Sequence, residues 1–234
     1  MLSNRAYLNF DLPDGRMSAY VARPQKVAPV VVVLQEIFGV NADLRATCNE
    51  LAERGFIGVA PDLFWREAPG LDLSSWSEPE WQRGLELYGR YDRDLGVRDV
   101  TAVVHAARRL EGVSGRVGVM GFCLGGLMTF LVAARAEVDA ACAYYGGDTE
   151  SYLDEMPAVE GPLLMHLAEE DEFMSKPAQA RIRDAARVPP NTQVHSYPGC
   201  HHAFARHTGV HYDAVAASTA NARTYAFFSK HLSR

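Results

Sequence analysis

The sequence predicts an α/β fold in which helices cover both faces of a mainly parallel central sheet, preceded by an N-terminal β-hairpin. The main observation is that short apolar segments alternate with helical patterns over most of the chain, an order typical of parallel sheets. In addition, Val30–Leu34 is β-branched and wholly apolar, as expected of a strand buried on both faces. Because there is no internal repeat, linker or low-complexity segment, we expect residues 1–234 to form a single domain.

Two regions near the N-terminus have distinctive local signals. Residues 5–22 alternate weakly between polar and apolar types, and Pro13-Asp14-Gly15 interrupts them, which predicts two strands joined by a turn. Residues 64–81 contain three tryptophans together with several Pro, Gly and Ser residues. This composition indicates a long excursion from the fold, and long loops in compact domains often serve function.

The remaining elements are expected from apolar runs and helical patterns bounded by Gly or Pro. In chain order, the expected strands are residues 30–34, 56–60, 116–121, 140–145, 161–167 and 192–197. The expected helices are residues 42–54, 79–110, 124–135, 176–187 and 213–232. Glycines 84, 89 and 96 weaken the pattern over 79–110, so this stretch can be one helix or two.

Composition and charge exclude several classes of protein. The chain is 48% hydrophobic and 22% charged, values of ordinary globular proteins, which excludes disordered and fibrous folds. A net charge of −6 and the lack of a basic tract argue against a nucleic-acid partner. No apolar run approaches the ~18 residues of a membrane span, and the first 20 residues lack an apolar leader core. We therefore expect a cytoplasmic protein with no membrane association.

The most informative motif is Gly121-Phe122-Cys123-Leu124-Gly125, which lies where an expected strand meets an expected helix. This spacing is that of a nucleophile elbow, with Cys in place of the commoner Ser. The nucleophile occupies a strained turn, and the flanking glycines let strand and helix pass closely. A helix N-terminus also favours the thiolate and can present the Leu124 N–H to an oxyanion. The alternative is a buried cysteine in a glycine-rich turn.

A base and an orienting acid are expected after the nucleophile in the chain. His202 is the candidate base, because the Gly199–Phe204 segment follows the expected strand ending at residue 197. The adjacent His201 should point away, since consecutive side chains diverge. A metal site formed by Cys200, His201 and His202 was weighed, but adjacent ligands have poor geometry and no His pair at i, i+4 supports them, so no metal is expected.

Asp171 is the candidate acid, because it follows the strand over 161–167 by a short loop. The surrounding carboxylates of residues 169–172 are expected to be mostly solvated loop residues. Glu36 and Ile37 follow the first core strand, where this arrangement places the second oxyanion N–H, which Ile37 would donate. Glu36 either holds or moves the thiol proton, or is a loop carboxylate paired with a nearby arginine.

Six segments together resemble the dienelactone hydrolase (carboxymethylenebutenolidase) family over essentially the whole chain. They are Q-E-I-F-G-V-N-A at 35–42, P-D-L-F at 61–64, A-P-G at 68–70, G-F-C-L-G-G at 121–126, Y-Y-G at 144–146 and H-A-F-A-R at 202–206. The resemblance implies an α/β-hydrolase fold and a triad of Cys123, His202 and Asp171. It also implies hydrolysis of dienelactone to maleylacetate without a cofactor, with Glu36 moving from the thiol toward Arg206 when substrate binds.

The resemblance further implies a substrate-binding set in which Arg206 is one of two arginines that hold a substrate carboxylate. Trp81 occupies the position of the second arginine. Arg83 is the nearest arginine that can take over its role, and Arg66 and Arg90 are further candidates. Phe38 and Tyr144, from two of the resembling segments, complete the expected set. Losing one charge-assisted contact costs roughly 1.5–3 kcal/mol, so the substrate can differ while the chemistry stays.

Two other functions are alternatives to hydrolysis of a small, anionic lactone or enol ester. One keeps the enzyme class and changes the substrate to a general ester or thioester. The other is a relative without catalysis that binds a small ligand, which the complete triad argues against. No feature of the sequence indicates an interface, so a monomer is expected.

Overall fold

A computed structural model describes residues 4–233. Within them, the strands pair into one eight-stranded sheet in the order β1-β2-β4-β3-β5-β6-β7-β8. The strands are β1 (Asn4–Leu12), β2 (Gly15–Arg23), β3 (Ala28–Leu34), β4 (Ile57–Pro61), β5 (Val113–Phe122), β6 (Ala140–Tyr144), β7 (Leu163–Ala168) and β8 (Thr192–Tyr197). β1 and β2 form the expected antiparallel hairpin, β2 is antiparallel to β4, and the other neighbours are parallel.

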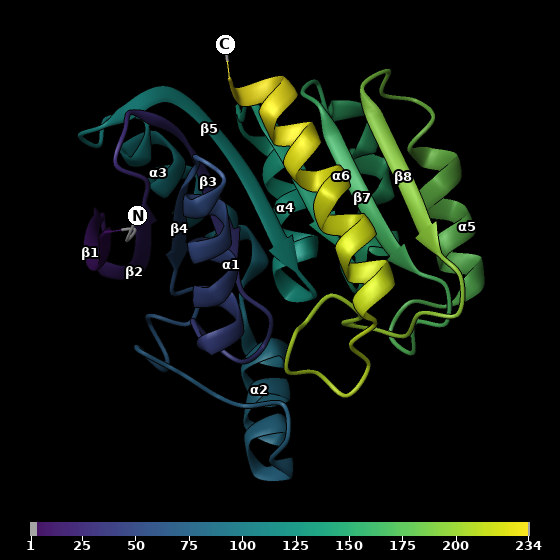
Figure 1. The fold of residues 1–234 in the computed structure, drawn as a ribbon. Coiled ribbons are helices and arrows are strands. Elements are labelled where there is room, and N and C mark those ends of the chain that lie inside the picture. The colour runs from purple at the N-terminus through teal and green to yellow at the C-terminus, as the bar shows by residue number, and fades with distance from the viewer. Residues whose placement is uncertain (1–3, 234) are drawn as a thin grey trace.

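Helices cover both faces of this sheet, as predicted (Figure 1). They are α1 (Ala42–Glu53), α2 (Glu78–Arg90), α3 (Arg93–Ala107), α4 (Leu124–Arg135), α5 (Lys176–Ala185), α6 (Ala214–Leu232) and the 3₁₀ segment η1 (Thr149–Ala158). α1 and α6 contribute to one apolar cluster, and α3, α4 and α5 contribute to the other. The sheet therefore separates two hydrophobic cores.

The apolar run in β3 explains why this strand is central. Val30, Val32 and Leu34 belong to one core, while Val31 and Val33 belong to the other, and all five are fully buried. Side chains alternate across a strand, so a run without polar residues is stable only with both faces covered. Burial of each such side chain stabilises the folded state by roughly 1.5–3 kcal/mol.

Three details differ from or refine the prediction. The stretch 79–110 is two helices, because the backbone at Tyr91 is extended and the Asp92 side chain caps α3 by accepting from the Leu95 N–H. β5 begins at Val113, three residues earlier than expected. The segment η1 had no clear signal, since its helical pattern is interrupted by Pro157 and by a non-helical Tyr152.

The parallel strands place several loops at one edge of the sheet. The loops after β3, β5, β6, β7 and β8 meet at the strands' carboxyl ends, and α2 lies beyond this edge (Figure 1). In open α/β sheets this is where ligands bind. Among residues 4–233, no helix has both the length and the apolar character required to cross a bilayer.

Candidate active site

Cys123 occupies a strained turn between β5 and α4. Its backbone has φ 53° and ψ −114°, a conformation that a residue with a side chain rarely adopts and that costs about 1–3 kcal/mol. Hydrogen bonds on both sides hold the turn: the Cys123 N–H donates to the Tyr144 carbonyl at 3.1 Å, and the Leu127 N–H donates to the Cys123 carbonyl at 3.1 Å. The strained turn is therefore fixed by its neighbours.

The glycines of the elbow are required by close packing. A Cβ atom at Gly121 would lie 2.2 Å from the carbonyl oxygen of Gly125, and one at Gly125 would lie 2.2 Å from that of Leu34. The Gly125 N–H also donates to the Gln35 carbonyl at 2.9 Å, which ties α4 to the loop after β3. The spacing read as an elbow thus brings strand, helix and the residue 35–39 loop into direct contact.

His202 and Asp171 form a closely paired and buried couple. Both carboxylate oxygens of Asp171 lie 2.9 Å from His202 Nδ1. The His202 side chain is 6% exposed and that of Asp171 is 0% exposed. A buried carboxylate on Nδ1 orients the ring so that Nε2 is the atom available for proton transfer. His202 Nε2 is buried and has no hydrogen-bond partner within residues 4–233, and its side chain lines the same pocket as Cys123.

The charges around His202 favour its protonated form. Burial lowers the pKa of His202, but attraction by a Cys123 thiolate and the hydrogen bond to Asp171 outweigh burial and raise the pKa to about 10. An imidazolium at His202 is therefore favoured wherever Cys123 is a thiolate. Such a pair has both a nucleophile and a proton donor.

Glu36 and Arg206 form a buried ion pair beside the candidate nucleophile. Arg206 Nη1 lies 2.8 Å from Glu36 Oε2, and the side chains are 8% and 9% exposed. The guanidinium also lies over the Phe38 ring, 4.9 Å from its centroid. Burial lowers the pKa of Arg206, but the Glu36 charge more than compensates and raises it. The carboxylate thus takes the position that the resemblance implies for it after movement toward Arg206.

The carboxylate of Glu36 is expected to control the reactivity of the Cys123 thiol. Glu36→Gln removes the charge that compensates Arg206, and an uncompensated guanidinium near the sulfur favours thiolate. We expect iodoacetamide to alkylate Cys123 several-fold faster in this variant without substrate, with a changed pH profile. Glu53→Gln, at an exposed position on α1, is the matched control. An unchanged profile would leave Glu36 as a loop carboxylate that only pairs with Arg206.

A pocket of about 130 Å³ with largely apolar walls contains Cys123, His202 and the Glu36–Arg206 pair. It is lined by Glu36, Ile37, Phe38, Trp81, Leu85, Tyr88, Cys123, Gly147, Asp148, Phe173, His202 and Arg206. The rings of Trp81, Phe38 and Phe173 pack together, with centroids 5.4 and 6.4 Å apart. The structure therefore brings Trp81 and Phe38 to the same cavity as Cys123 and His202.

Two residues of the expected substrate-binding set lie elsewhere. Arg83 is partly exposed on α2, where its Nη1 lies 2.6 Å from Glu86 Oε2. Tyr144 is fully buried in the core beneath α6, where its hydroxyl bonds Thr224 and donates to Asn221. Neither contributes to the pocket lining, so the expectation is wrong for both. Arg66 and Arg90 are also held elsewhere, by ion pairs with acidic side chains.

Tyr145 packs against the candidate base in place of Tyr144. Its ring centroid lies 5.1 Å from that of His202, and its buried hydroxyl has no partner within residues 4–233. Burial raises its pKa well above the usual value. Tyr144 is the last residue of β6, whereas Tyr145 lies beyond the strand with φ 36°, so the strand alternation does not decide which tyrosine contacts the base.

Five pocket residues were not predicted from the sequence. Leu85 and Tyr88 come from α2, Gly147 and Asp148 follow β6, and Phe173 lies two residues beyond Asp171, with its ring 4.8 Å from that of His202. Tyr88 donates a hydrogen bond to Asp148. Leu85 and Tyr88 are placed by the close contact of α2 with the 35–39 loop, where a Cβ atom at Gly84 would lie 2.9 Å from the Ile37 carbonyl oxygen.

The two expected oxyanion donors stay a prediction. Leu124 is the first residue of α4, so its N–H has no partner within the helix. Ile37 follows Glu36 and lines the pocket. With Cys123 and His202, these N–H groups would make up the set that acyl transfer needs: a nucleophile, a base and two backbone donors.

Known proteins match this chain over nearly its full length. The family model for the dienelactone hydrolase family matches residues 17–232. Carboxymethylenebutenolidases from Pseudomonas putida and Cupriavidus pinatubonensis are 40% identical over 218 residues and 37% identical over 211 residues. These alignments cover 92% and 90% of this chain, respectively, and the same shares of the two relatives. The crystal structure of a candidate dienelactone hydrolase from Klebsiella pneumoniae has a TM-score of 0.87 at 26% identity, covering 98% of this chain and 100% of that one. The chain therefore belongs to the dienelactone hydrolase family, carboxylic ester hydrolases with the α/β-hydrolase fold.

Proposed function

We propose that the chain opens a small lactone or enol ester by nucleophilic catalysis at Cys123, with dienelactone, converted to maleylacetate, as the candidate substrate. The observation that supports this most strongly is a Cys at the strained turn, sharing a pocket with a histidine that a buried Asp171 holds at 2.9 Å. The names of the 40% identical relatives favour the same substrate class.

The reaction proceeds in two steps. The Cys123 thiolate attacks the lactone carbonyl carbon, and the N–H groups of Ile37 and Leu124 bind the oxyanion. The ring C–O bond breaks, the protonated His202 donates its proton to the enolate leaving group, and a thioester remains on Cys123. Water then gives a proton to neutral His202 and attacks the thioester, releasing the carboxylate product and the thiolate. An enolate is a good leaving group, which suits a cysteine nucleophile.

Arg206 is the proposed anchor for a substrate carboxylate. It is the guanidinium that lines the pocket, and its planar donors suit bidentate capture of a carboxylate. Glu36 pairs with its Nη1, while the buried Nε has no partner within residues 4–233, so a substrate carboxylate can bind donors that Glu36 leaves free.

Hydrolysis of a less anionic ester is the second candidate, and one observation favours it. Trp81 lines the pocket in which Arg206 is already compensated by Glu36, and its neighbours Phe38 and Phe173 are aromatic. A panel of dienelactone, neutral aryl acetates and a thioester, assayed before and after thiol alkylation, separates the candidates. Hydrolysis of aryl acetates alone would overturn the dienelactone assignment, and activity that survives alkylation would overturn the cysteine mechanism.

Removal of the Arg206 guanidinium should affect anionic substrates selectively. Arg206→Ala alone leaves the Glu36 charge buried and unpaired, at a cost of about 3–5 kcal/mol in stability. The informative comparison is therefore Glu36→Gln against Glu36→Gln/Arg206→Ala, which differ in the guanidinium but share the neutral side chain at residue 36. We expect the double variant to raise KM for carboxylate-bearing lactones by about tenfold or more and to leave neutral aryl esters nearly unchanged.

The complementary change introduces a second cation into the pocket at residue 81. Trp81→Arg should lower KM for dienelactone if one anchor is missing. Equal weakening of anionic and neutral substrates by loss of Arg206 would mean that it does not bind a substrate carboxylate. The neutral-ester candidate would then be the better supported.

A further inference from the structure

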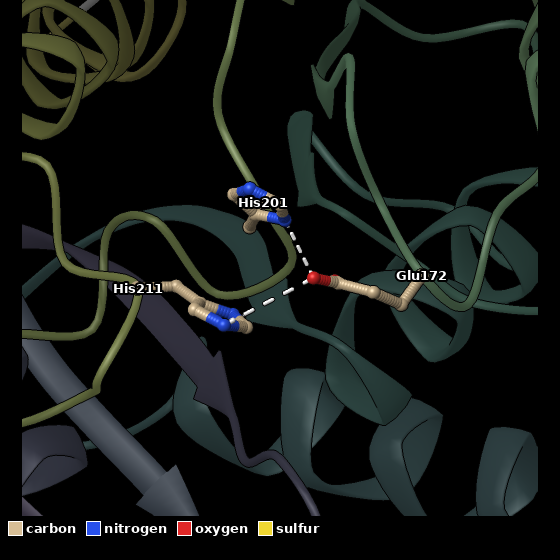
Figure 2. A group of neighbouring side chains, drawn as sticks. All are labelled: Glu172, His201 and His211. Carbon is tan, nitrogen blue, oxygen red and sulfur yellow. Dashed lines mark hydrogen bonds and ion pairs between the residues drawn. The ribbon is translucent and has the colours of Figure 1, made fainter.

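Three metal-binding side-chain atoms converge on the surface next to the candidate base. Glu172 Oε1 lies 2.6 Å from His201 Nδ1 and 3.9 Å from His211 Nε2, and all three atoms lie within 4.8 Å of one another. Figure 2 shows both imidazoles directed at the same carboxylate oxygen. Ligand atoms around a tetrahedral zinc ion are about 3.4 Å apart, given bonds of ~2.0–2.1 Å. Small side-chain rotations would therefore bring these three atoms to ligand distances.

The hydrogen bond on the other side of His211 determines which of its ring nitrogens can bind a metal. His211 Nδ1 lies 3.2 Å from the carbonyl oxygen of His202. A carbonyl only accepts, so Nδ1 carries a proton, and in the neutral ring Nε2 has the lone pair. This lone pair faces an acceptor, Glu172 Oε1, and a cation between them would satisfy both. Histidine ligands of metals usually donate their second N–H to a carbonyl or carboxylate in this way.

Two of these three residues, Glu172 and His211, hold the backbone of the candidate base. Glu172 Oε2 accepts from the His202 N–H at 3.2 Å, and His211 donates to the His202 carbonyl. Glu172 comes from the loop after β7 that carries Asp171, whereas His201 and His211 come from the loop after β8 that carries His202. An ion bound through Oε1 leaves Oε2 on the His202 N–H, so it would connect the two loops without breaking this contact.

The donor set determines which ion fits. Two imidazoles and one carboxylate suit borderline transition metals, whereas Mg²⁺ and Ca²⁺ prefer oxygen ligands alone. All three side chains are exposed, so water can complete the coordination. We propose that Glu172, His201 and His211 form a surface site for a divalent ion such as Zn²⁺, which fastens the Asp171 loop to the His202 loop. This site is separate from the proposed ester chemistry and does not require it.

Zinc titration of the Cys123→Ala protein tests the site. This background removes the pocket thiol, which would otherwise bind zinc itself. We expect calorimetry to show one Zn²⁺ per chain and thermal unfolding to show a zinc-dependent rise in Tm that EDTA reverses, because an ion that binds only the folded chain stabilises it. Adding His211→Ala or Glu172→Gln should weaken zinc binding by about tenfold or more and reduce the rise in Tm, since changes even outside the ligands cost ~10–100-fold.

Matched controls make the result decisive. His207→Ala removes another histidine of the same loop, which lies near Glu50 and not in the cluster, and should leave zinc binding unchanged. Glu172→Gln keeps an oxygen that can accept from the His202 N–H, and circular dichroism verifies that each variant is folded. Absence of zinc binding at millimolar concentration, or equal binding by the Glu172→Gln, His211→Ala and His207→Ala proteins, would overturn the site. The cluster would then be histidines paired with a carboxylate and nothing more.

Discussion

Cys123→Ala is expected to abolish ester hydrolysis while the protein stays folded. The substitution removes the sulfur that forms the acyl intermediate, and loss of the nucleophile in other triad hydrolases lowers kcat on the order of 10⁶-fold. The fold should tolerate the change, because the strained turn is held by backbone hydrogen bonds of Cys123 and by the packing of Gly121 and Gly125. Initial rates on aryl acetates and dienelactone, with circular dichroism for folding, measure both parts.

Labelling of the wild-type protein locates the reactive sulfur. Cys48 and Cys142 are fully buried and Cys200 is nearly so, whereas Cys123 lines the pocket. Burial raises the pKa of each of the three buried thiols, and that of Cys142 reaches about 12, so they remain protonated and unreactive. Iodoacetamide should therefore add one label, at Cys123, together with loss of activity. A label on another cysteine, with Cys123→Ala still active, would refute the triad.

His202→Ala should lower kcat by several powers of ten, and by no less than the ~10²-fold of a positioned base. The alanine removes the group that protonates the enolate and activates water, and it leaves Asp171 buried without its partner. Because that unpaired carboxylate also destabilises the fold, His202→Gln is the second variant, with a polar side chain in the same place. Single-turnover and steady-state rates separate acylation from deacylation.

A second histidine of the same loop, His207, provides the control for this result. His207→Ala changes an exposed ring in the same loop and should keep kcat within a factor of about two to three, as surface substitutions usually do. If His202→Gln retained activity close to that of His207→Ala, His202 would be a structural histidine. The nucleophile would then have to act without a base.

The regular elements followed from the sequence because their signals are local. The runs at Val30–Leu34 and Thr192–Tyr197, and the helix Leu124–Arg135 that starts directly after the elbow, matched observed elements closely or in full. Uncertainty remained where signals conflict. The glycines of 79–110 weaken helix propensity, yet a Cβ atom at Gly84 would lie 2.9 Å from the Ile37 carbonyl oxygen, and only the fold shows that contact.

The candidate triad could be read from the sequence for a similar reason. Cys123, Asp171 and His202 each lie just after an expected strand, and parallel strands bring their carboxyl ends to one edge, so position in the chain nearly determines position in space. No such rule predicts which residues form the pocket walls. Trp81, Leu85 and Tyr88 come from α2, whose docking depends on contacts with the 35–39 loop, and Arg83 on the same helix pairs with Glu86 outside the pocket lining.

The sequence by itself determined the fold class, the order of elements and the positions of Cys123, Asp171 and His202, because strand periodicity and the glycine spacing of the elbow are properties of short segments. Tertiary structure alone decided which neighbour of a pair meets the site, as for Tyr145 over Tyr144, and that Glu36 lies on Arg206, 170 residues away. It also brought Glu172 to His201 and His211. Such contacts depend on where whole elements dock and on which rotamers the surroundings allow, and neither is encoded in a local pattern.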